Sequence, residues 1–333
     1  MSTLADVARL AGVGTGTASR AISGNGYVDP DTRRKVLDAA AELGYRRNAA
    51  ARALRERRSR VVGLVLPDLH NEFYTASAAV LQADLHAAGY QLLVLATGND
   101  PSGERAAWET LLDRQVDGVV HVPVDPDGTA PPGLPVVQLN RHTRDTTASA
   151  VVSDDVAGVA DLTRGVLDAG HTDVVAIVGA TQLSTSAERL AGFRRAAEDA
   201  GLVEDGTDGP RFRVLVTEFS ADGGAAAMRR LGDDLPSAVV ALSSRLVMGV
   251  LRWAGEGGVR IPEDMSLAGL GDPEWFAIWR PAITTFAPPL ADMGRHAARR
   301  LIAAMSGEEP ETGILRLAGE VRTRGSVSTR RRR

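Results

Sequence analysis

The residues with the clearest chemistry lie near the start of the chain, on one face of a short helix expected over residues 15–22. With the apolar side chains of this segment turned inward, four residues remain on its outer face: Thr15, Gly16, Ser19 and Arg20. A preceding helix, joined to it through a glycine-containing turn, completes a helix–turn–helix, a motif whose second helix enters the major groove of DNA. The chemistry that this segment favours is therefore hydrogen bonding to a nucleic acid.

The helices that must position this face carry clear start and stop signals. Thr3 is expected to cap the first helix, with Asp6 three residues further on in a near capping box, and Gly12 to end it. Asp29 caps a third helix with Pro30 at its first position, where the missing N–H of proline costs nothing. Apolar residues at helical spacing predict a small three-helix core, which is completed by Val13 and Tyr45.

The charge distribution separates this head from the rest of the chain. Residues 1–60 hold 12 basic and 6 acidic residues, which leaves 26 basic and 36 acidic residues from the totals of 38 and 42. A basic head on an acidic body favours a head that binds a polyanion. Chance clustering on a solvated face would give the same count, so charge alone does not decide the matter.

The body alternates apolar runs with amphipathic helical stretches. The runs fall at residues 61–66, 92–95, 116–122, 136–139, 174–178, 214–216, 238–242 and 266–270. Helical stretches separate them at residues 76–88, 105–114, 156–169 and 189–200, among others. Continuous apolar strands between helices are typical of parallel sheets covered on both faces, and this number of strands predicts two doubly wound subdomains.

The head closely resembles the DNA-binding head of the LacI/GalR (lactose-repressor) family. The pattern T-L-x-D-V-A-x-x-A-G-V begins at Thr3, and T-x-S-R begins at Thr17. The patterns T-R-x-K-V and L-G-Y-x-x-N begin at Thr32 and Leu43. A generic three-helix bundle does not explain so many coincident positions.

The resemblance implies two sets of DNA contacts in the head. Base reading is implied for Thr15, Gly16 and Arg20. Contacts with phosphate or the groove wall are implied for Thr17 and Ser19, and hydrogen bonds to phosphates that fix the docking register for Thr3 and Asn48. Arg20 has the side chain for a bidentate contact to guanine, the commonest specific contact in DNA complexes.

Two glycines depart from the family pattern. Gly14 stands where relatives usually have serine, so the N-cap of the reading helix is expected to be weak. Gly16 has no side chain to reach a base edge. Operator choice is therefore expected to depend on Arg20, Thr15 and the linker.

Residues 49–60 resemble the hinge helix of the family. Alone, so short a helix does not offset its nucleation cost, but two copies can pair in the minor groove of DNA. Leu54 matches the apolar wedge that opens a base step, and Ala51 belongs to the same expected contact segment. A merely flexible basic tether is the alternative reading.

The body is similar to periplasmic sugar-binding proteins, on matches at residues 62–68, 71–74, 116–120, 188–194 and 259–266. The implied fold is a small all-α helix–turn–helix head joined by a hinge helix to an α/β core of two doubly wound parallel-sheet subdomains. The expected division is a head at 1–47, a hinge at 48–60 and a basic tail at 329–333. The subdomains are expected at 61–153 with 287–317, and at 154–286 with 318–328.

An effector is expected in the crevice between the subdomains, at the carboxyl ends of the strands. By resemblance its site includes Phe73, Tyr74, Asn140, Arg189, Phe219, Ser243 and Asp272. Purely structural roles remain open as alternatives to ligand binding. In these, the aromatic residues belong to the core, Asn140 forms hydrogen bonds within its loop, and Arg189 pairs at the surface with Glu188 or Asp155.

The second subdomain also departs from the pattern of sugar binders. Ser243 and Ser244 stand where many relatives have Asn-Asp, and Gly271 replaces an acidic residue. These losses argue against an ordinary hexose as effector. Three nearby aromatic residues either make that wall more apolar or lie outside the cleft against a dimer partner: Trp275, Phe276 and Trp279.

Catalytic, cofactor and metal sites are not expected. The glycines at 12, 14 and 16 have neither the spacing nor the preceding strand of a nucleotide loop. The 6 histidines lack metal-ligand spacing, and Asp68 with His70 has no nucleophile motif beside it. With no cysteine, no secretory signal and no membrane-length apolar run, a cytoplasmic protein is expected, nucleoid-associated when it binds DNA.

The sequence therefore predicts a ligand-responsive transcriptional regulator and not an enzyme. We expect a repressor that binds a palindromic operator as a homodimer and takes a sugar or related polar metabolite as effector, without a membrane partner. No heptad segment follows Val327, in agreement with a dimer. The alternative, a periplasmic-type solute-binding protein, is disfavoured by the head. The tail at 330–333 is expected to be solvated, with a phosphate contact as the alternative.

Overall fold

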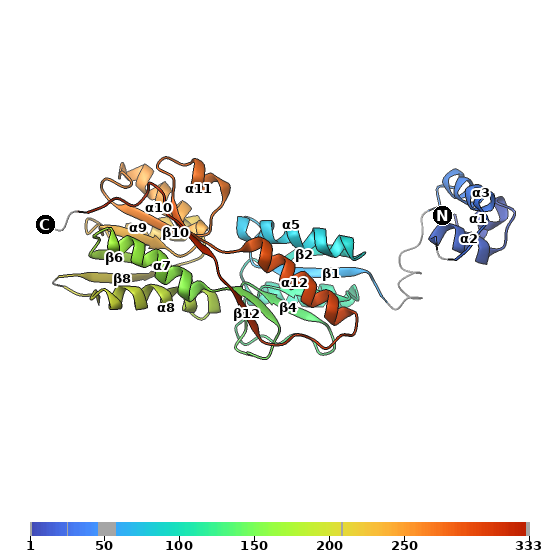
Figure 1. Cartoon of the computed structure of the whole chain (residues 1–333), viewed down its shortest axis with the longest axis horizontal. Helices are drawn as coiled ribbons and strands as arrows, with labels where there is room; N and C mark the ends of the chain where they lie inside the picture. The colour runs from blue at the N-terminus through green and yellow to red at the C-terminus, as the bar shows by residue number, and fades with distance from the viewer. Residues whose placement is uncertain (1, 25, 46–57, 208, 331–333) are drawn as a thin grey trace. The chain divides into compact units, whose positions relative to one another are not determined.

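The computed structural model describes residues 2–24, 26–45, 58–207 and 209–330, and the chain divides into two compact units, Met1–Ser59 and Arg60–Arg333. The first unit contains three described helices, α1 (Leu4–Leu10), α2 (Thr15–Ser23) and α3 (Pro30–Glu42). The second contains two sheets with helices on both faces of each (Figure 1).

The caps predicted for the head are confirmed. Thr3 and Asp6 form a complete capping box at the start of α1. Asp29 accepts a hydrogen bond from the backbone N–H of Thr32 at 3.0 Å, and Pro30 opens α3. Gly12 follows α1 with φ +68°, a left-handed conformation that costs glycine little. This conformation lets the chain change direction between α1 and α2.

The core of the head forms where the apolar faces of the three helices meet. Val7, Ala18 and Val36, one from each helix, are completely buried. Val13 and Tyr45 pack against this cluster, as predicted. The outward side of α2 is thereby left to its polar residues.

The first sheet of the body contains six described strands in the order β12-β5-β4-β3-β1-β2, and every pairing between neighbours is parallel. The strands are β1 (Val61–Leu66), β2 (Gln91–Ala96), β3 (Gly118–His121), β4 (Val136–Leu139), β5 (Ala150–Ser153) and β12 (Ile314–Leu317). The order reverses between β1 and β3, which makes this the switch point of a doubly wound sheet.

The second sheet contains seven described strands in the order β13-β11-β10-β9-β6-β8-β7. They are β6 (Asp173–Val178), β7 (Val203–Glu204), β8 (Arg211–Val216), β9 (Ala238–Ala241), β10 (Ser266–Leu270), β11 (Thr284–Ala287) and β13 (Glu320–Arg322). The predicted doubly wound parallel sheet is confirmed, with one antiparallel addition at its edge, where β13 pairs with β11. The switch point lies between β6 and β9.

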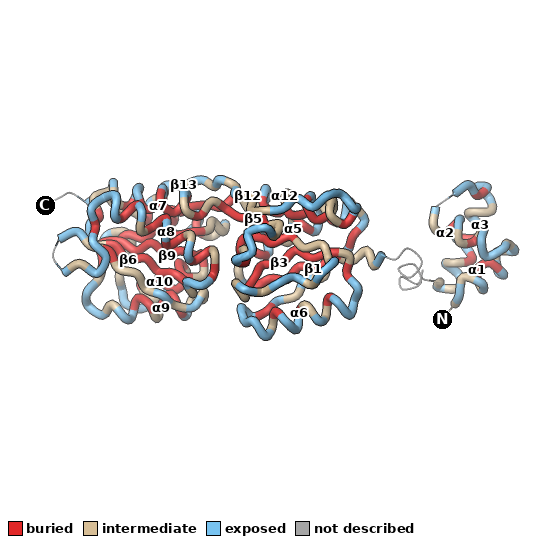
Figure 2. The backbone as a smooth tube through the Cα atoms, turned by 90° about the horizontal axis from the view of Figure 1, so that it is seen from below, coloured by how far each residue is buried: buried red, intermediate tan, exposed pale blue. Residues whose placement is uncertain are grey.

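Helices cover both faces of each sheet. In the first sheet, α5 (Glu72–Ala87) and α12 (Leu290–Met305) run side by side over one face, and α6 (Pro101–Asp113) covers the other (Figure 1). In the second, α7 (Asp155–Asp168) and α8 (Ser184–Asp199) pack opposite α9 (Ala221–Arg229) and α10 (Ser244–Gly257). The central strands of both sheets are accordingly among the most buried segments (Figure 2). A short helix, α11 (Glu274–Ile278), precedes β11.

The chain passes between the two subdomains three times, at residues 153–155, 287–290 and 317–320. The strands of the first sheet lie within residues 61–153 and 314–317, and those of the second lie within residues 173–287 and 320–322. Both sheets turn the carboxyl ends of their strands toward one shared crevice, because loops that follow strands of both line the same cavity. The candidate ligand site therefore lies in this crevice between the two subdomains.

Candidate functional site

The outer face of α2 is the candidate DNA-reading surface. Thr15, Gly16 and Arg20 are exposed, while Thr17 and Ser19 are partly buried. The Nη2 atom of Arg20 lies 3.4 Å from the hydroxyl of Thr17, a weak contact that leaves the guanidinium available. The structure therefore gathers the head residues expected to read or flank bases on one accessible helix face.

Other DNA-contact residues have a different placement. The hydroxyl of Thr3 donates to Asp6 at 2.7 Å and accepts from its backbone N–H, so this side chain is already used to cap α1. Asn48, Ala51 and Leu54, and with them most of the hinge, lie outside the described residues. Their contacts therefore stay predictions.

The weak cap of the reading helix is confirmed. Gly14 occupies the N-cap position of α2 and contributes no side-chain hydrogen bond. At Gly16, an added Cβ would meet no atom within 4 Å. Glycine at this position therefore does not serve packing, and the space beside it is open to a ligand.

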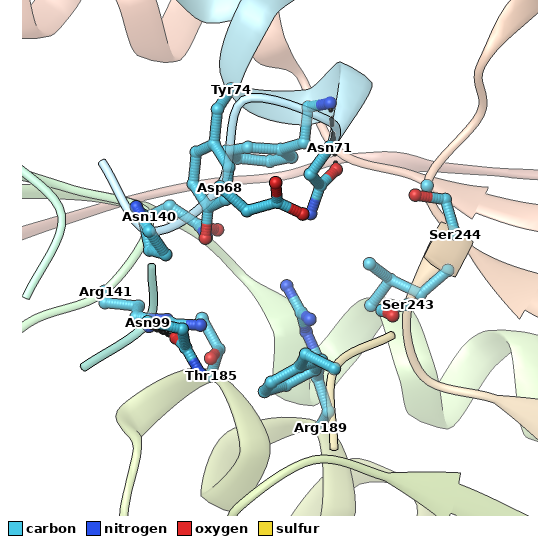
Figure 3. Close-up of a pocket in the computed structure, with 15 residues that line it drawn as sticks. Asp68, Asn71, Tyr74, Asn99, Asn140, Arg141, Thr185, Arg189, Ser243 and Ser244 are labelled. Atoms are coloured by element: carbon cyan, nitrogen blue, oxygen red, sulfur yellow. Dashed lines mark hydrogen bonds between the residues drawn. The ribbon is translucent and has the colours of Figure 1, made fainter. Parts of the chain in front are cut away.

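A polar cavity lies at the carboxyl ends of the strands of both sheets (Figure 3). Its volume is about 50 Å³, room for a few water molecules in this conformation. Among the residues expected from sequence, six line it: Phe73, Tyr74, Asn140, Arg189, Phe219 and Ser243. Ser243 also caps α10, since its hydroxyl accepts a hydrogen bond from the N–H of Leu246 at 3.3 Å.

Asp272 does not line this cavity. Its carboxylate accepts hydrogen bonds from Arg324 at 2.8 Å and from Thr285 at 3.3 Å, and Arg322 also pairs with it. Burial alone would raise the pKa of Asp272, but the two arginines hold it below its ordinary value. The carboxylate of Asp272 is therefore held by arginines at the end of β13 and just after it.

Arg189 forms a buried ion pair. Its side chain, 5% exposed as a residue, donates from Nε to Asp155 at 2.6 Å and from Nη1 to the carbonyl oxygen of Leu242 at 3.1 Å. The alternative that Arg189 pairs with Glu188 or Asp155 at the surface is correct in naming Asp155 as a partner. It is wrong about the location, because the pair is buried. Burial raises the pKa of Asp155, and the Arg189 guanidinium opposes that shift.

Several lining residues were not named as effector contacts from sequence. They are Pro67, Asp68, Asn71, Asn99, Arg141, Thr185, Ser244, Leu270 and Gly271. Most follow a strand or open the next helix, so the rule that ligands bind beyond the carboxyl ends of strands could have found them. Asn99 and Asn140 adopt φ of 60° and 63°, left-handed backbone that aims their loops into the cavity.

A larger groove of about 740 Å³ adjoins the cavity and shares Phe73, Ser244 and Gly271 with it. Trp275 lines this groove and donates from Nε1 to Glu72 at 3.1 Å, which links the two subdomains. Phe276 is completely buried, and Trp279 is 44% exposed and lines neither space. Of the three aromatic residues, only Trp275 therefore makes a ligand-accessible wall.

A second link between the subdomains is ionic. Glu188 of α8 lies 3.0 Å from Nε2 of His142, which follows β4, and 2.7 Å from Arg316 of β12. Burial alone would raise the pKa of Glu188, but hydrogen bonds from His142 and Arg316 lower it to about 2. The same hydrogen bond raises the pKa of His142, with burial opposing part of the shift.

This link gives a prediction on pH. Because the folded pKa of His142 is raised, its contribution to stability is full below its unfolded pKa of about 6.5 and is lost as pH rises through the folded value. Glu188 acts in the opposite sense, and its contribution is lost as pH falls from about 4.3 toward 2. The stability lost in His142→Gln should therefore be greatest near pH 5–6 and should shrink toward pH 8.

Melting temperatures of wild type and His142→Gln, measured across pH 4.5–8.5, check this expectation. The control is His86→Gln, which removes an exposed imidazole from α5. A His142→Gln difference that stays constant over this range would show that the imidazole is not a charged partner of Glu188.

No helix in the ranges that the structure describes combines the length and apolar composition needed to cross a membrane.

Comparison with known proteins gives two family matches. Residues 3–48 match the model of the bacterial regulatory proteins of the lacI family, and residues 163–327 match a periplasmic binding protein-like domain. The chain is 34% identical to the HTH-type transcriptional regulator CelR of Thermobifida fusca over 323 residues, which covers 93% of each protein.

Solved structures that resemble this chain support the same family assignment and fold. A putative LacI-family repressor from Corynebacterium glutamicum is 36% identical, with a TM-score of 0.70 over 81% of this chain and 99% of that one. The lac repressor dimer bound to operator has a TM-score of 0.84 over 98% of this chain and 99% of that one. At 22% identity, the second match shows the fold alone.

Proposed function

This chain belongs to the lacI family of bacterial regulatory proteins, and we propose that it represses transcription by binding a palindromic operator as a homodimer under control of a small-molecule effector. Members of this family are regulators of transcription, not enzymes. The observation that carries the proposal is the accessible polar face of α2 on an independently packed three-helix head. A solute-binding protein would have no use for that face.

The DNA contacts are assigned to the head in this proposal. Thr15 and Arg20 read bases, Gly16 lets the helix backbone approach the groove, and Thr17 and Ser19 contact phosphates or the groove wall. The hinge residues contribute from the segment beyond Tyr45. In a homodimer the two reading helices meet two half-sites, which requires an operator with twofold symmetry.

The effector site is assigned to the cavity between the subdomains. It is lined by polar groups from both subdomains. Hydrogen bonds outside its lining also join the subdomains, and a ligand that changes their angle would alter these bonds. A ligand that changes their angle shifts the equilibrium between DNA-binding and non-binding states, a coupling of about 1–3 kcal/mol in typical cases. We place the protein in the cytoplasm, on the nucleoid when an operator is bound.

The test is selection from random DNA. Wild-type protein should enrich a twofold-symmetric sequence from a pool of random duplexes, and the same motif should occur upstream of its own gene. Sedimentation of the complex should give two chains per duplex. A pool that stays random after repeated rounds, while the protein remains folded, would refute sequence-specific repression.

A further inference from the structure

A small cluster of polar side chains fastens the loop after β4 to the start of α8, across the boundary between the subdomains. Asn140 lines the cavity from that loop, and His142 lies two residues further along it. Thr185 of α8 lines the cavity from the other subdomain. The backbone N–H of His142 donates to the hydroxyl of Ser184 at 3.0 Å, and its Nε2 atom lies 3.0 Å from Glu188. These two parts of the cavity lining therefore cannot separate without breaking the contacts of His142.

Both ring nitrogens of His142 face oxygen atoms that have no proton to give. Nδ1 lies 2.8 Å from the carbonyl oxygen of Thr143, and Nε2 lies 3.0 Å from Oε1 of Glu188. Glu188 has a pKa of about 2, so its carboxyl group is ionised at neutral pH. A neutral imidazole carries one N–H and satisfies one of these acceptors, whereas the imidazolium satisfies both. The geometry therefore fits the protonated ring.

Neither acceptor is free to turn away when the ring loses its proton. Thr143 is 3% exposed, and its backbone N–H and its hydroxyl each bond to the side chain of Gln138 at 3.0 Å. Glu188 accepts hydrogen bonds from Arg316 at 2.8 and 2.7 Å. A neutral ring therefore turns a lone pair toward one of two fixed oxygen atoms. Because Thr143 adjoins His142 in the chain, separation of the subdomains relieves this repulsion only at Glu188.

The charged groups around the ring set the pH at which this happens. In the described ranges, Glu188 on α8 and Arg316 on β12 face His142. Arg316 in turn lies in the field of Asp154 and Asp155 at the start of α7. The hydrogen bond with Glu188 raises the pKa of His142 above its ordinary value of about 6.5, although burial and the charge of Arg316 oppose the shift. Arg316 stays charged and bonded to Glu188, so loss of the proton weakens the link without removing it.

The conformation held by this link has a narrow cleft. The cavity measures about 50 Å³, whereas small-molecule sites usually measure about 300–1,000 Å³. Entry of a ligand of ordinary size into the cavity therefore requires its walls to move apart. The loop after β4 and the start of α8 are two of these walls, and the contacts of His142 oppose their separation.

We propose that His142 is a proton-operated clamp: its imidazolium holds the loop after β4 against α8 and keeps the cleft narrow, and loss of its proton lets the cleft widen and admit the effector. The effector enters this inference through the proposed function, whereas the clamp is a property of the body alone. The proton and the effector then oppose each other, so a given effector concentration occupies less of the protein in acid.

The experiment measures the opening of the cleft directly, by pulsed electron-spin resonance between two nitroxide labels. The chain has no cysteine, so labels attach only where one is introduced. Glu109→Cys on α6 and Arg229→Cys on α9 place them at exposed positions, one in each subdomain. Both helices lie on the side of the body opposite β12 and β13, so their separation reports the angle about the crossovers (Figure 2). Labelled chain is diluted with unlabelled chain, so that each distance is measured within one chain.

Each sample is measured at about pH 6 and about pH 8.5, on either side of the expected titration. The control is His86→Gln, which removes an exposed imidazole from α5. Wild type and this control should show a short distance at the lower pH and a growing longer distance at the higher pH. The ratio of short to long should fall about 10-fold, the effect of one charge-assisted hydrogen bond.

Two substitutions of His142 separate its charge from its titration. His142→Gln has no charge and should show the longer distance at both pH values. His142→Lys keeps its charge over this range and should show mainly the short distance at both. The proposal is overturned if the wild-type distances are the same at both pH values, or if they change with pH in His142→Gln as they do in wild type.

Selection of operator DNA from a random pool by unlabelled wild type tests the proposed function separately. A failed selection leaves the measured distances standing as a property of the body. Distances that do not respond to pH refute the clamp and leave the result of the DNA selection unchanged.

Discussion

Replacing Arg189 with methionine is expected to lower the free energy of unfolding by about 3–5 kcal/mol, the cost of leaving one partner of a buried ion pair alone. Asp155 is 2% exposed, and its Oδ1 atom already lacks a hydrogen-bond partner. Without the Arg189 guanidinium, the rise in the pKa of Asp155 that burial causes is opposed only by the smaller effect of a hydrogen bond from the Ser153 side chain. Since Asp155 opens α7 directly after the first crossover, the loss should also loosen the connection between the subdomains.

Urea unfolding of wild type and three variants checks this expectation. Arg194→Met is the matched control, because Arg194 lies one and a half turns along the same helix in an exposed pair with Glu204 and should cost about 0–1 kcal/mol. The pair Asp155→Leu with Arg189→Met should recover most of the loss, since well-packed apolar residues often replace a buried ion pair without penalty. An Arg189→Met loss no larger than that of Arg194→Met would show that the pair is solvated in solution.

Replacing Arg20 with alanine is expected to lower affinity for the operator about 10- to 100-fold, the range of about 1–3 kcal/mol that one bidentate base contact contributes to discrimination. The side chain is exposed on α2, and among the described residues its guanidinium makes only the weak hydrogen bond with Thr17. The head should therefore stay folded. Affinity for nonspecific DNA should fall much less, because that binding depends on total charge.

Titrations of operator and random duplex at two salt concentrations separate these effects. Arg34→Ala removes the same charge from α3, where the arginine pairs with Asp31 on an exposed surface. It should weaken binding to both duplexes by a similar small factor. If Arg20→Ala loses affinity for both duplexes equally, Arg20 contacts phosphate and does not read a base.

Much of the fold was predictable because burial and sequence pattern agree. The apolar runs of β1, β4 and β10 were located to the residue, since these strands are buried between helices. Five strands were missed: β5, β7, β11, β12 and β13. Of these, β7 and β13 have two and three residues and are mostly exposed. A short polar edge strand has no pattern that distinguishes it from a loop.

The site was predictable where a side chain acts beside its own strand and was missed where partners come from far along the chain. Six expected residues meet at one cavity because each follows a strand end or opens the next helix. Asp272 lines only the adjoining groove, because Arg322 at the end of the antiparallel strand β13 and Arg324 just after it hold its carboxylate, and this strand was not predicted. Arg141 stands next to the expected Asn140, but only the fold shows that it is buried in the cavity wall with its Nε atom unpaired among the described residues.

The most direct test of a ligand-controlled DNA reader is the operator dissociation constant of wild type with and without saturating cleft ligand. We predict a change of about 5- to 150-fold, matched by an equal change in ligand affinity when operator is bound, because binding linkage is reciprocal. A ligand that occupies the cleft and leaves both constants unchanged would contradict the account.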